Sequence, residues 1–311
     1  MVKRYGVKTI LAVAITVALW STTFAGMVAA LGHFSPHHLL FLRWTLTSVL
    51  FVVAGVVTGV RLPHAKDLPL IALAGVLGFS GYQLLLVNGQ AGVSATMAGF
   101  LTNLNPVFTT VIGVALGKER GRWNTWAGIA VCTFGLLVMA QGKGGFGQVG
   151  PSAGLVVLAA LSFASYTLVA KPLMSTYRPL EVTTYALIAG SLPFLIFAPG
   201  SMHALTSAPA SAVANLVYLA VLPGGVAYVL WSYVVHKMAP GVAARFLYLI
   251  PVIGVPVAWV WVGEAPRAVT VAGGLLIIAG VALASARLGL PRLRVAHGAT
   301  VATDAGLPEA A

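Results

Sequence analysis

The sequence predicts an all-α polytopic membrane protein with ten transmembrane helices, arranged as two inverted five-helix repeats. Three observations lead to this fold class: an apolar composition, a long internal repeat, and an asymmetric distribution of lysine and arginine. Of the 311 residues, 59% are hydrophobic and 8% are charged, and the mean hydropathy is +0.95. A soluble domain of this length cannot bury so much apolar surface, so we expect its solvent to be lipid.

The internal repeat is clearest between residues 98–119 and 243–264. Each stretch is apolar, contains a proline (Pro106 or Pro251) and ends 13 residues after that proline in a glutamate preceded closely by glycine. The two copies are offset by 145 positions. The same offset pairs other residues downstream: Thr125 with Thr270, Gly128 with Gly273, and Gly135 with Gly280. A shared period of this length indicates a duplication of half the chain.

Ten apolar runs follow one another along the chain, and most of them have the ~17–25 residues that cross a hydrocarbon core. The predicted spans are 9–31, 38–60, 68–87, 94–116, 125–140, 153–170, 181–197, 212–235, 242–262 and 270–286. We expect helices, because lipid cannot satisfy an open backbone amide and the alternating pattern of a barrel strand is missing.

The basic residues predict the orientation. With the amino terminus in the cytoplasm, 14 of the 18 lysines and arginines fall in cytoplasmic segments and only Lys143 and Arg267 fall in outer loops. This bias places both termini inside the cell. Five spans per repeat is an odd number, so the second half enters the membrane inverted relative to the first.

The predicted domains are a first repeat at 1–141, a glycine-rich outer linker at 142–151, a second repeat at 152–287 and a disordered cytoplasmic tail at 288–311. The linker contains Gly142, Gly144 and Gly147, which match a dinucleotide-binding loop in spacing. That motif requires a strand before it and a helix after it, so we expect no cofactor here. We also expect no metal site, because the sequence holds no zinc-ligand pair, and no nucleic-acid partner, because the basic residues are scattered between apolar runs.

The chain resembles a known family. Two five-span halves, each with 12 residues between a proline and a glutamate, look like the EamA-type drug/metabolite transporters, and residues 18–22 (Ala-Leu-Trp-Ser-Thr) are similar to that family's opening helix. The first copy departs slightly from the second, because Lys118 separates Gly117 from Glu119, whereas Gly263 directly precedes Glu264. Within the family the chain looks most like the YddG-type amino acid exporters. The resemblance implies a ten-helix bundle that exports small metabolites by alternating access, in a bacterial inner membrane, as a monomer or a homodimer.

Transporters with inverted repeats bind substrate near the bilayer midplane, where the halves meet. Polar and aromatic residues inside the spans are therefore the candidates for substrate binding: Trp20, Tyr82, Gln83, Asn103, Tyr166, Tyr228, Trp231 and Tyr248. Helix packing is the alternative for the aromatic residues, and an interhelical hydrogen bond is the alternative for Asn103. Pro106 and Pro251 each leave a carbonyl unpaired one turn earlier, which favours a hinge at both positions.

Arg43 and Arg245 are the only charged residues inside the predicted spans. Each lies a few residues from the start of its span. One interpretation is that the side chain extends to the lipid headgroups; the other is that it binds a substrate carboxylate.

The function that these features predict is export of amphipathic metabolites, most simply aromatic or neutral amino acids. A cationic drug/proton antiporter and a membrane-embedded lipid enzyme are the alternatives. The six acidic residues all lie in loops, span ends or the tail, so no catalytic acid/base pair is expected. Because no span holds a carboxylate well inside the bilayer, we expect facilitated transport without obligatory proton exchange.

Overall fold

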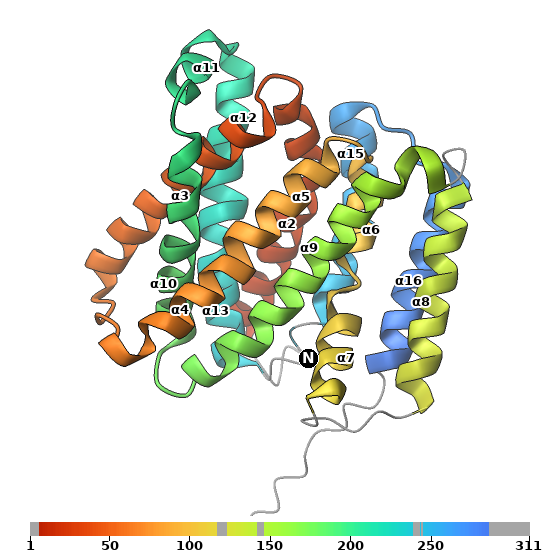
Figure 1. The fold of residues 1–311 in the computed structure, drawn as a ribbon, viewed down its shortest axis with the longest axis horizontal. Coiled ribbons are helices and arrows are strands. Elements are labelled where there is room, and N and C mark those ends of the chain that lie inside the picture. Colours follow the sequence, from red (N-terminus) through yellow and green to blue (C-terminus); the bar gives the residue numbers. More distant parts are fainter. Residues whose placement is uncertain (1–5, 117–122, 142–145, 239–242, 244, 286–311) are drawn as a thin grey trace, which may run out of the picture.

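The computed structural model describes residues 6–116, 123–141, 146–238, 243 and 245–285, and every regular element in these ranges is helical (Figure 1). Seven helical stretches are long and apolar enough to cross a membrane, and three shorter apolar helices lie at Trp123–Val138, Phe246–Val262 and Ala268–Leu283. The protein is therefore a multi-pass membrane protein, and the count of ten spans stays a prediction.

The first half contains the elements α2 (Val7–Leu31), α3 (Pro36–Thr58), η1 (Ala65–Asp67), α4 (Leu68–Gly75), η2 (Val76–Gly81), α5 (Tyr82–Gln90), α6 (Ala95–Thr102), α7 (Asn105–Ala115) and α8 (Trp123–Gln141). The second half contains α9 (Phe146–Leu173), α10 (Pro179–Ser191), η3 (Leu192–Phe197), α11 (Ser201–Ser207), α12 (Ala210–Val221), η4 (Leu222–Val226), α13 (Ala227–Lys237), η5 (Arg245–Tyr248), α15 (Leu249–Val262) and α16 (Ala268–Ser285).

The second predicted span, 38–60, corresponds to α3, and local capping signals at both of its ends account for the difference in bounds. The helix α3 begins two residues earlier than predicted, because Ser35 accepts a hydrogen bond from the His38 amide and Pro36 fits the first turn. It ends at Thr58 because Gly59 adopts the left-handed conformation, with a φ of 66°.

Several of the predicted spans are interrupted rather than continuous. The third and eighth contain the π-helical segments η2 and η4. The fourth divides into α6 and α7, and Pro106 occupies the first turn of α7, where a missing amide proton costs least. Pro251 lies in the first turn of α15, which follows the short 3-10 helix η5. Both prolines thus mark a break in their span, and their hinge role stays a prediction.

Some predictions fall partly outside the described residues. The helix α9 begins at Phe146, so positions 146–151 of the predicted linker are helical, while 142–145 lie outside. The Gly117-Lys118-Glu119 segment and the tail at 288–311 also lie outside, as does the side chain of Arg245.

The helices α8 and α16 pack side by side along their lengths (Figure 1), and glycines make this possible. A Cβ atom added at Gly135 would lie 2.6 Å from the Gly273 carbonyl oxygen, and one added at Gly280 would lie 2.7 Å from the Gly128 carbonyl oxygen. These four glycines are the two pairs that the 145-residue period relates. The contact is therefore reciprocal, as it is across a two-fold axis.

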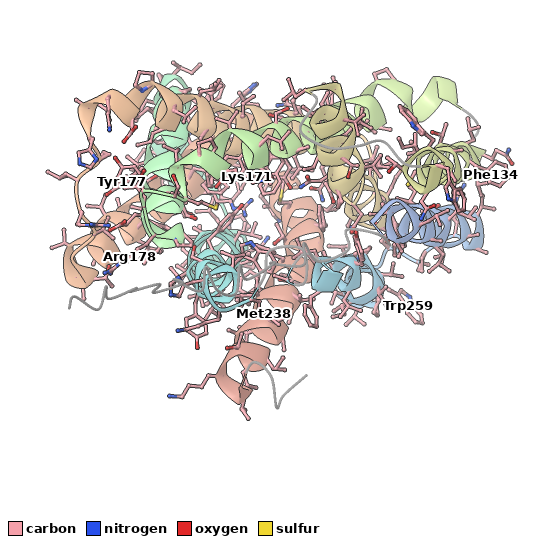
Figure 2. The ribbon with its side chains drawn as sticks, turned by 90° about the horizontal axis from the view of Figure 1, so that it is seen from below. Phe134, Lys171, Tyr177, Arg178, Met238 and Trp259 are labelled. Carbon is pink, nitrogen blue, oxygen red and sulfur yellow. The ribbon has the colours of Figure 1, made fainter. Side chains whose placement is uncertain are left out.

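Large apolar side chains cover the perimeter of the bundle. Phe134 and Trp259 point away from it (Figure 2), and 58% and 61% of their surfaces are exposed. We interpret this perimeter as the surface that contacts lipid.

Candidate substrate-binding site

Aromatic side chains from both halves meet in the centre of the bundle. The Trp20 ring lies 5.3 Å from Tyr228 and 5.4 Å from Trp231, measured between ring centroids. The Phe79 ring joins the two halves, because its centroid lies 5.5 Å from Trp44, 5.8 Å from Tyr228 and 5.9 Å from Tyr166.

The group continues toward α5 and α9. The ring of Phe163 lies 5.0 Å from Tyr82 and 5.4 Å from Tyr166. We call the connected set the aromatic cluster; it consists of Trp20, Trp44, Phe79, Tyr82, Phe163, Tyr166, Tyr228 and Trp231. The structure thus brings together five of the residues that the sequence singled out. Trp44, Phe79 and Phe163 were not predicted.

The two π-helical segments place Tyr82 and Tyr228 in equivalent positions. Tyr82 directly follows η2, and Tyr228 follows η4 after one residue, 146 positions later. A π-helical turn leaves carbonyls without their normal partners, and side chains from neighbouring helices bind them here. Ser162 Oγ donates to the Leu77 oxygen at 2.7 Å, and Trp20 Nε1 donates to the Pro223 oxygen at 3.2 Å.

Arg43 lies beside this cluster and is almost completely buried, with 3% of its surface exposed. Its guanidinium centre is 5.1 Å from the Trp44 ring centroid, and its Nη1 donates to the Met27 sulfur at 3.5 Å. The interpretation in which Arg43 extends to the headgroups is therefore wrong, because helix packing has turned the side chain inward.

The hydrogen bonding of Arg43 is incomplete. Its Nε finds no acceptor among the described residues, and thioether sulfur is a weak acceptor for Nη1. A buried guanidinium without a carboxylate is energetically costly, so it suggests a ligand that supplies the missing oxygens.

The remaining predicted residues, Gln83, Asn103 and Tyr248, differ in how their polar groups are satisfied and where they pack. Gln83 is buried, and its Oε1 has no partner within the described ranges. Asn103, by contrast, donates to the Gly99 oxygen one turn earlier in α6, at 2.9 Å, so its amide group caps its own helix rather than bridging to another. Tyr248 is half-buried at the end of η5 and packs against the apolar core.

Two sequence neighbours could have indicated Phe79 and Trp44, which were not predicted: Gly78, which lies against a predicted ring, and Arg43. A Cβ atom at Gly78 would lie 2.6 Å from the Tyr166 ring, so glycine is what lets this ring pack against the backbone of η2. Phe79 follows Gly78 directly, and Trp44 follows Arg43. No metal-binding group of three or more His, Cys, Asp or Glu side chains occurs in the described part of the chain.

The model of the EamA-like transporter family matches residues 7–141 and again residues 151–286. The chain belongs to the EamA-like transporter family. It is accordingly a transporter and not an enzyme.

Individual relatives of this EamA-like transporter agree. The chain is 37% identical to a "Probable terminal-alkyne amino-acid exporter" of Streptantibioticus cattleyicolor, over 90% of its own length and 94% of the relative's. It is 30% identical to "Uncharacterized transporter YdfC" of Bacillus subtilis, over 90% and 91%. A crystal structure of a protein with 21% identity superposes with a TM-score of 0.61, covering 89% of this chain and 96% of the other, which shows a likeness of fold alone.

At one end of this EamA-like transporter, Glu264 connects the halves. Its carboxylate accepts hydrogen bonds from the amides of Ala95, at 2.7 Å, and Thr96, at 3.1 Å, while Ser94 accepts one from Met97. Side chains therefore satisfy the first three amides of α6. Beside this cap is a hollow of about 410 Å³, lined in part by Gln90 and Ser94.

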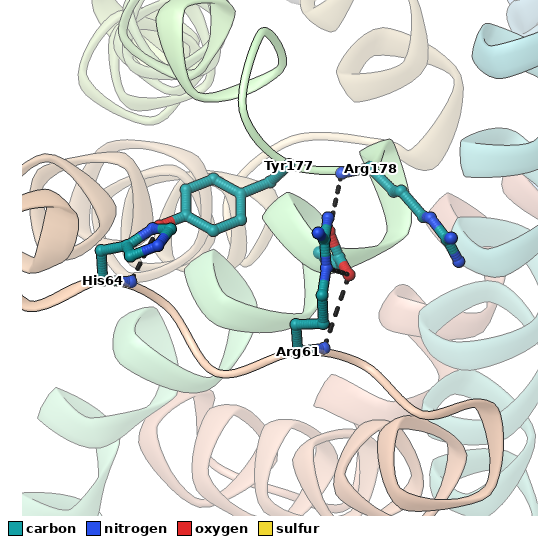
Figure 3. Close-up of polar contacts among 5 residues, drawn as sticks. Arg61, His64, Tyr177 and Arg178 are labelled. Atoms are coloured by element: carbon teal, nitrogen blue, oxygen red, sulfur yellow. Dashed lines mark hydrogen bonds and ion pairs between the residues drawn. The ribbon is translucent and has the colours of Figure 1, made fainter.

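At the opposite end, Glu181 ties the loop after α3 to the start of α10 (Figure 3). Its carboxylate accepts from Arg61 Nε at 3.3 Å and from the Arg178 amide at 2.8 Å, and this interaction raises the pKa of the Arg61 guanidinium. Nearby, Tyr177 accepts a hydrogen bond from the His64 amide at 2.9 Å and donates to Asp67 at 2.7 Å. Contacts between the halves thus hold both ends of the bundle.

Proposed function

We propose that this protein exports amino acids with apolar or aromatic side chains, and that Arg43 binds their carboxylate. The observation that carries the proposal is a buried guanidinium with an unpartnered Nε beside an aromatic cluster built from both halves. The name of the 37% identical relative, an amino-acid exporter, supports the same substrate class.

In this proposal the two ends of the substrate bind to different groups. The carboxylate accepts charge-assisted hydrogen bonds from Arg43, each contributing roughly 1.5–3 kcal/mol. The apolar part packs against the aromatic cluster, where full burial of such a side chain contributes about 1.5–3 kcal/mol. Gln83 and the tyrosine hydroxyls provide neutral polar partners for the amino group.

The membrane arrangement that we propose has ten spans, with both termini in the cytoplasm and the second five-span half inverted. The site would then lie at the interface of the halves, where inverted-repeat transporters bind substrate. The protein would alternate its access by moving one half against the other, with breaks at Pro106 and Pro251 as hinges. A bacterial inner membrane is the proposed location.

The cationic antiporter is the weaker alternative. A cation entering the aromatic cluster would meet the positive charge of Arg43. A proton-coupled antiporter of cations generally needs a carboxylate at depth, and the described carboxylates Glu181 and Glu264 bond to groups at the ends of the bundle.

Uptake into proteoliposomes tests the proposal. Purified protein is reconstituted and supplied with labelled phenylalanine, leucine, lysine or glutamate. We expect uptake of the first two, and a loss of tenfold or more in the Arg43→Gln variant. Lys171→Gln, which removes a positive charge from an exposed position, is the control and should retain uptake. Equal uptake by both variants, or uptake of lysine alone, would contradict the proposal.

A further inference from the structure

Arg43 has no fixed counter-ion among the described residues. In the described ranges the ion pairs join Arg61 to Glu181 and His64 to Asp67, and Arg43 takes part in neither. Arg43 and Glu181 are the buried charged residues there, and the carboxylate of Glu181 is already occupied at the end of the bundle. The central site therefore carries one uncompensated positive charge when it is empty.

The groups around Arg43 suit a carboxylate better than a complete amino acid zwitterion. The face of Trp44 and the sulfur of Met27 leave the Nε proton unbonded, and a planar carboxylate matches a guanidinium through two parallel hydrogen bonds. Among the residues that the structure describes, a ligand ammonium has no comparable partner, because Glu181, Glu264 and Asp67 bond elsewhere. In that part of the chain only neutral acceptors remain for it, such as the unpartnered Oε1 of Gln83.

Charge balance leads to the same substrate class. A monoanionic carboxylate bound to Arg43 makes the site neutral, whereas a zwitterion leaves it with a net charge of one. Enclosing a net charge away from water costs several kcal/mol, so the neutral complex is easier to occlude. The amino group is then a feature that the site tolerates rather than requires.

We infer that the site recognises apolar carboxylates as net monoanions, that the α-amino group is dispensable for binding, and that the membrane potential drives their export. This inference rests on the proposed function, because it takes Arg43 as the carboxylate-binding group. In the loaded state the site crosses the membrane as a neutral pair; in the empty state Arg43 returns with its charge uncovered. A cytoplasm at negative potential attracts that charge inward, so each cycle exports one negative charge without a coupling ion.

Matched ligands of one carbon skeleton test the recognition. Binding to the detergent-purified protein is measured by calorimetry for L-phenylalanine, 3-phenylpropionate and phenethylamine, and again for L-leucine, 4-methylpentanoate and isopentylamine. In at least one set we expect the amine-free carboxylate to bind as tightly as the amino acid, or more tightly, and the amine to show no binding. If the amino acid binds and its amine-free analogue is weaker by tenfold or more, the inference is wrong and the proposed function stands. If neither carboxylate binds in either set, both are wrong.

Electrical measurement tests the charge movement. Proteoliposomes adsorbed to a solid-supported membrane should give a current when 3-phenylpropionate or 4-methylpentanoate is added, whichever binds, and no sustained current with its zwitterion. With valinomycin and a tenfold potassium gradient that makes the lumen positive, a transported monoanion should accumulate up to about tenfold. Absence of current and of accumulation would overturn the inference.

Variants at Arg43 connect both readouts to this residue. Arg43→Gln should lose carboxylate binding by tenfold or more and abolish the current, while Lys171→Gln should retain both. Arg43→Lys keeps the charge but not the planar pair of donors, so it should bind more weakly while giving current of the same sign. Wild-type binding by Arg43→Gln would overturn the inference.

Discussion

The sulfur of Cys132 lies 3.5 Å from the carbonyl oxygen of Ile277, and these two residues are repeat counterparts, 145 positions apart. A residue can touch its own counterpart only where the two halves meet around their common axis. The axis that relates the repeats therefore passes between α8 and α16. This position explains why the glycines of the period lie there: each allows a backbone of one half to approach the other.

Substitution at the close contact should destabilise the protein. In Gly135→Ala the new methyl group would overlap the Gly273 carbonyl oxygen, which is backbone and cannot rotate away. Overpacking of this kind costs typically 1–3 kcal/mol, so we expect the melting temperature in detergent to fall by several degrees. Gly154→Ala is the matched control, because no atom lies within 4 Å of its added Cβ. Equal melting temperatures would contradict the packing described for α8 and α16.

Truncation of the aromatic cluster should weaken transport. Trp231→Ala removes a wall against which the substrate's apolar part would pack, and a loss of about 1.4 kcal/mol or more corresponds to tenfold weaker transport. Tyr82→Ala and Tyr228→Ala should act in the same direction. Trp259→Ala, at an exposed position on the perimeter, should leave uptake unchanged. Normal uptake by all three cluster variants would place the substrate elsewhere.

Labelling of single cysteines checks the topology. In a background without Cys132, cysteines replace Gly121, Gly145, Pro240 and Ala265 one at a time, and intact cells are treated with an impermeant maleimide. We expect labelling at positions 145 and 265 and protection at 121 and 240, because the basic residues favour the cytoplasmic side. The opposite pattern would mean that the orientation is inverted.

Transport should not require a proton gradient. None of the predicted spans holds an aspartate or glutamate well inside the bilayer, so a group that exchanges a proton for substrate is lacking there. At a clamped membrane potential, counterflow and net flux should be the same with and without a pH gradient. Uphill accumulation driven by the pH gradient alone would refute this, and His236, at the end of α13, would be the first residue to replace.

Loss of the Glu264 carboxylate should loosen the start of α6. Glu264→Ala leaves the amides of Ala95 and Thr96 without acceptors, at a cost of about 0.5–2 kcal/mol for a cap. Hydrogen exchange at these amides should accelerate, while Glu264→Gln, which keeps one acceptor oxygen, should have a smaller effect. Exchange at the wild-type rate in Glu264→Ala would show that the contact is dispensable.

The sequence by itself determined the helical membrane architecture and the duplication. Apolar runs of spanning length must form helices, because lipid offers no partner to a backbone amide, and the period of prolines and glycines is visible without any structure. Five members of the aromatic cluster, including Tyr82 and Tyr228, could also be named, because polar and aromatic residues in the middle of apolar runs are few. Their part in substrate binding stays a proposal.

Only the tertiary structure decided where these groups lie. The position of Arg43 near the start of its span was compatible with headgroups as well as with the interior, and the packing of α3 against its neighbours turned it inward. The π-helical segments before Tyr82 and Tyr228 could not be read from hydrophobic periodicity, because they depend on side chains such as Ser162 and Trp20, distant in sequence, that bind the carbonyls they leave open. The cap on α6 is equally non-local. The residue pattern along one helix does not indicate which other helix packs against it or bonds to its open backbone groups. The site depends on that packing.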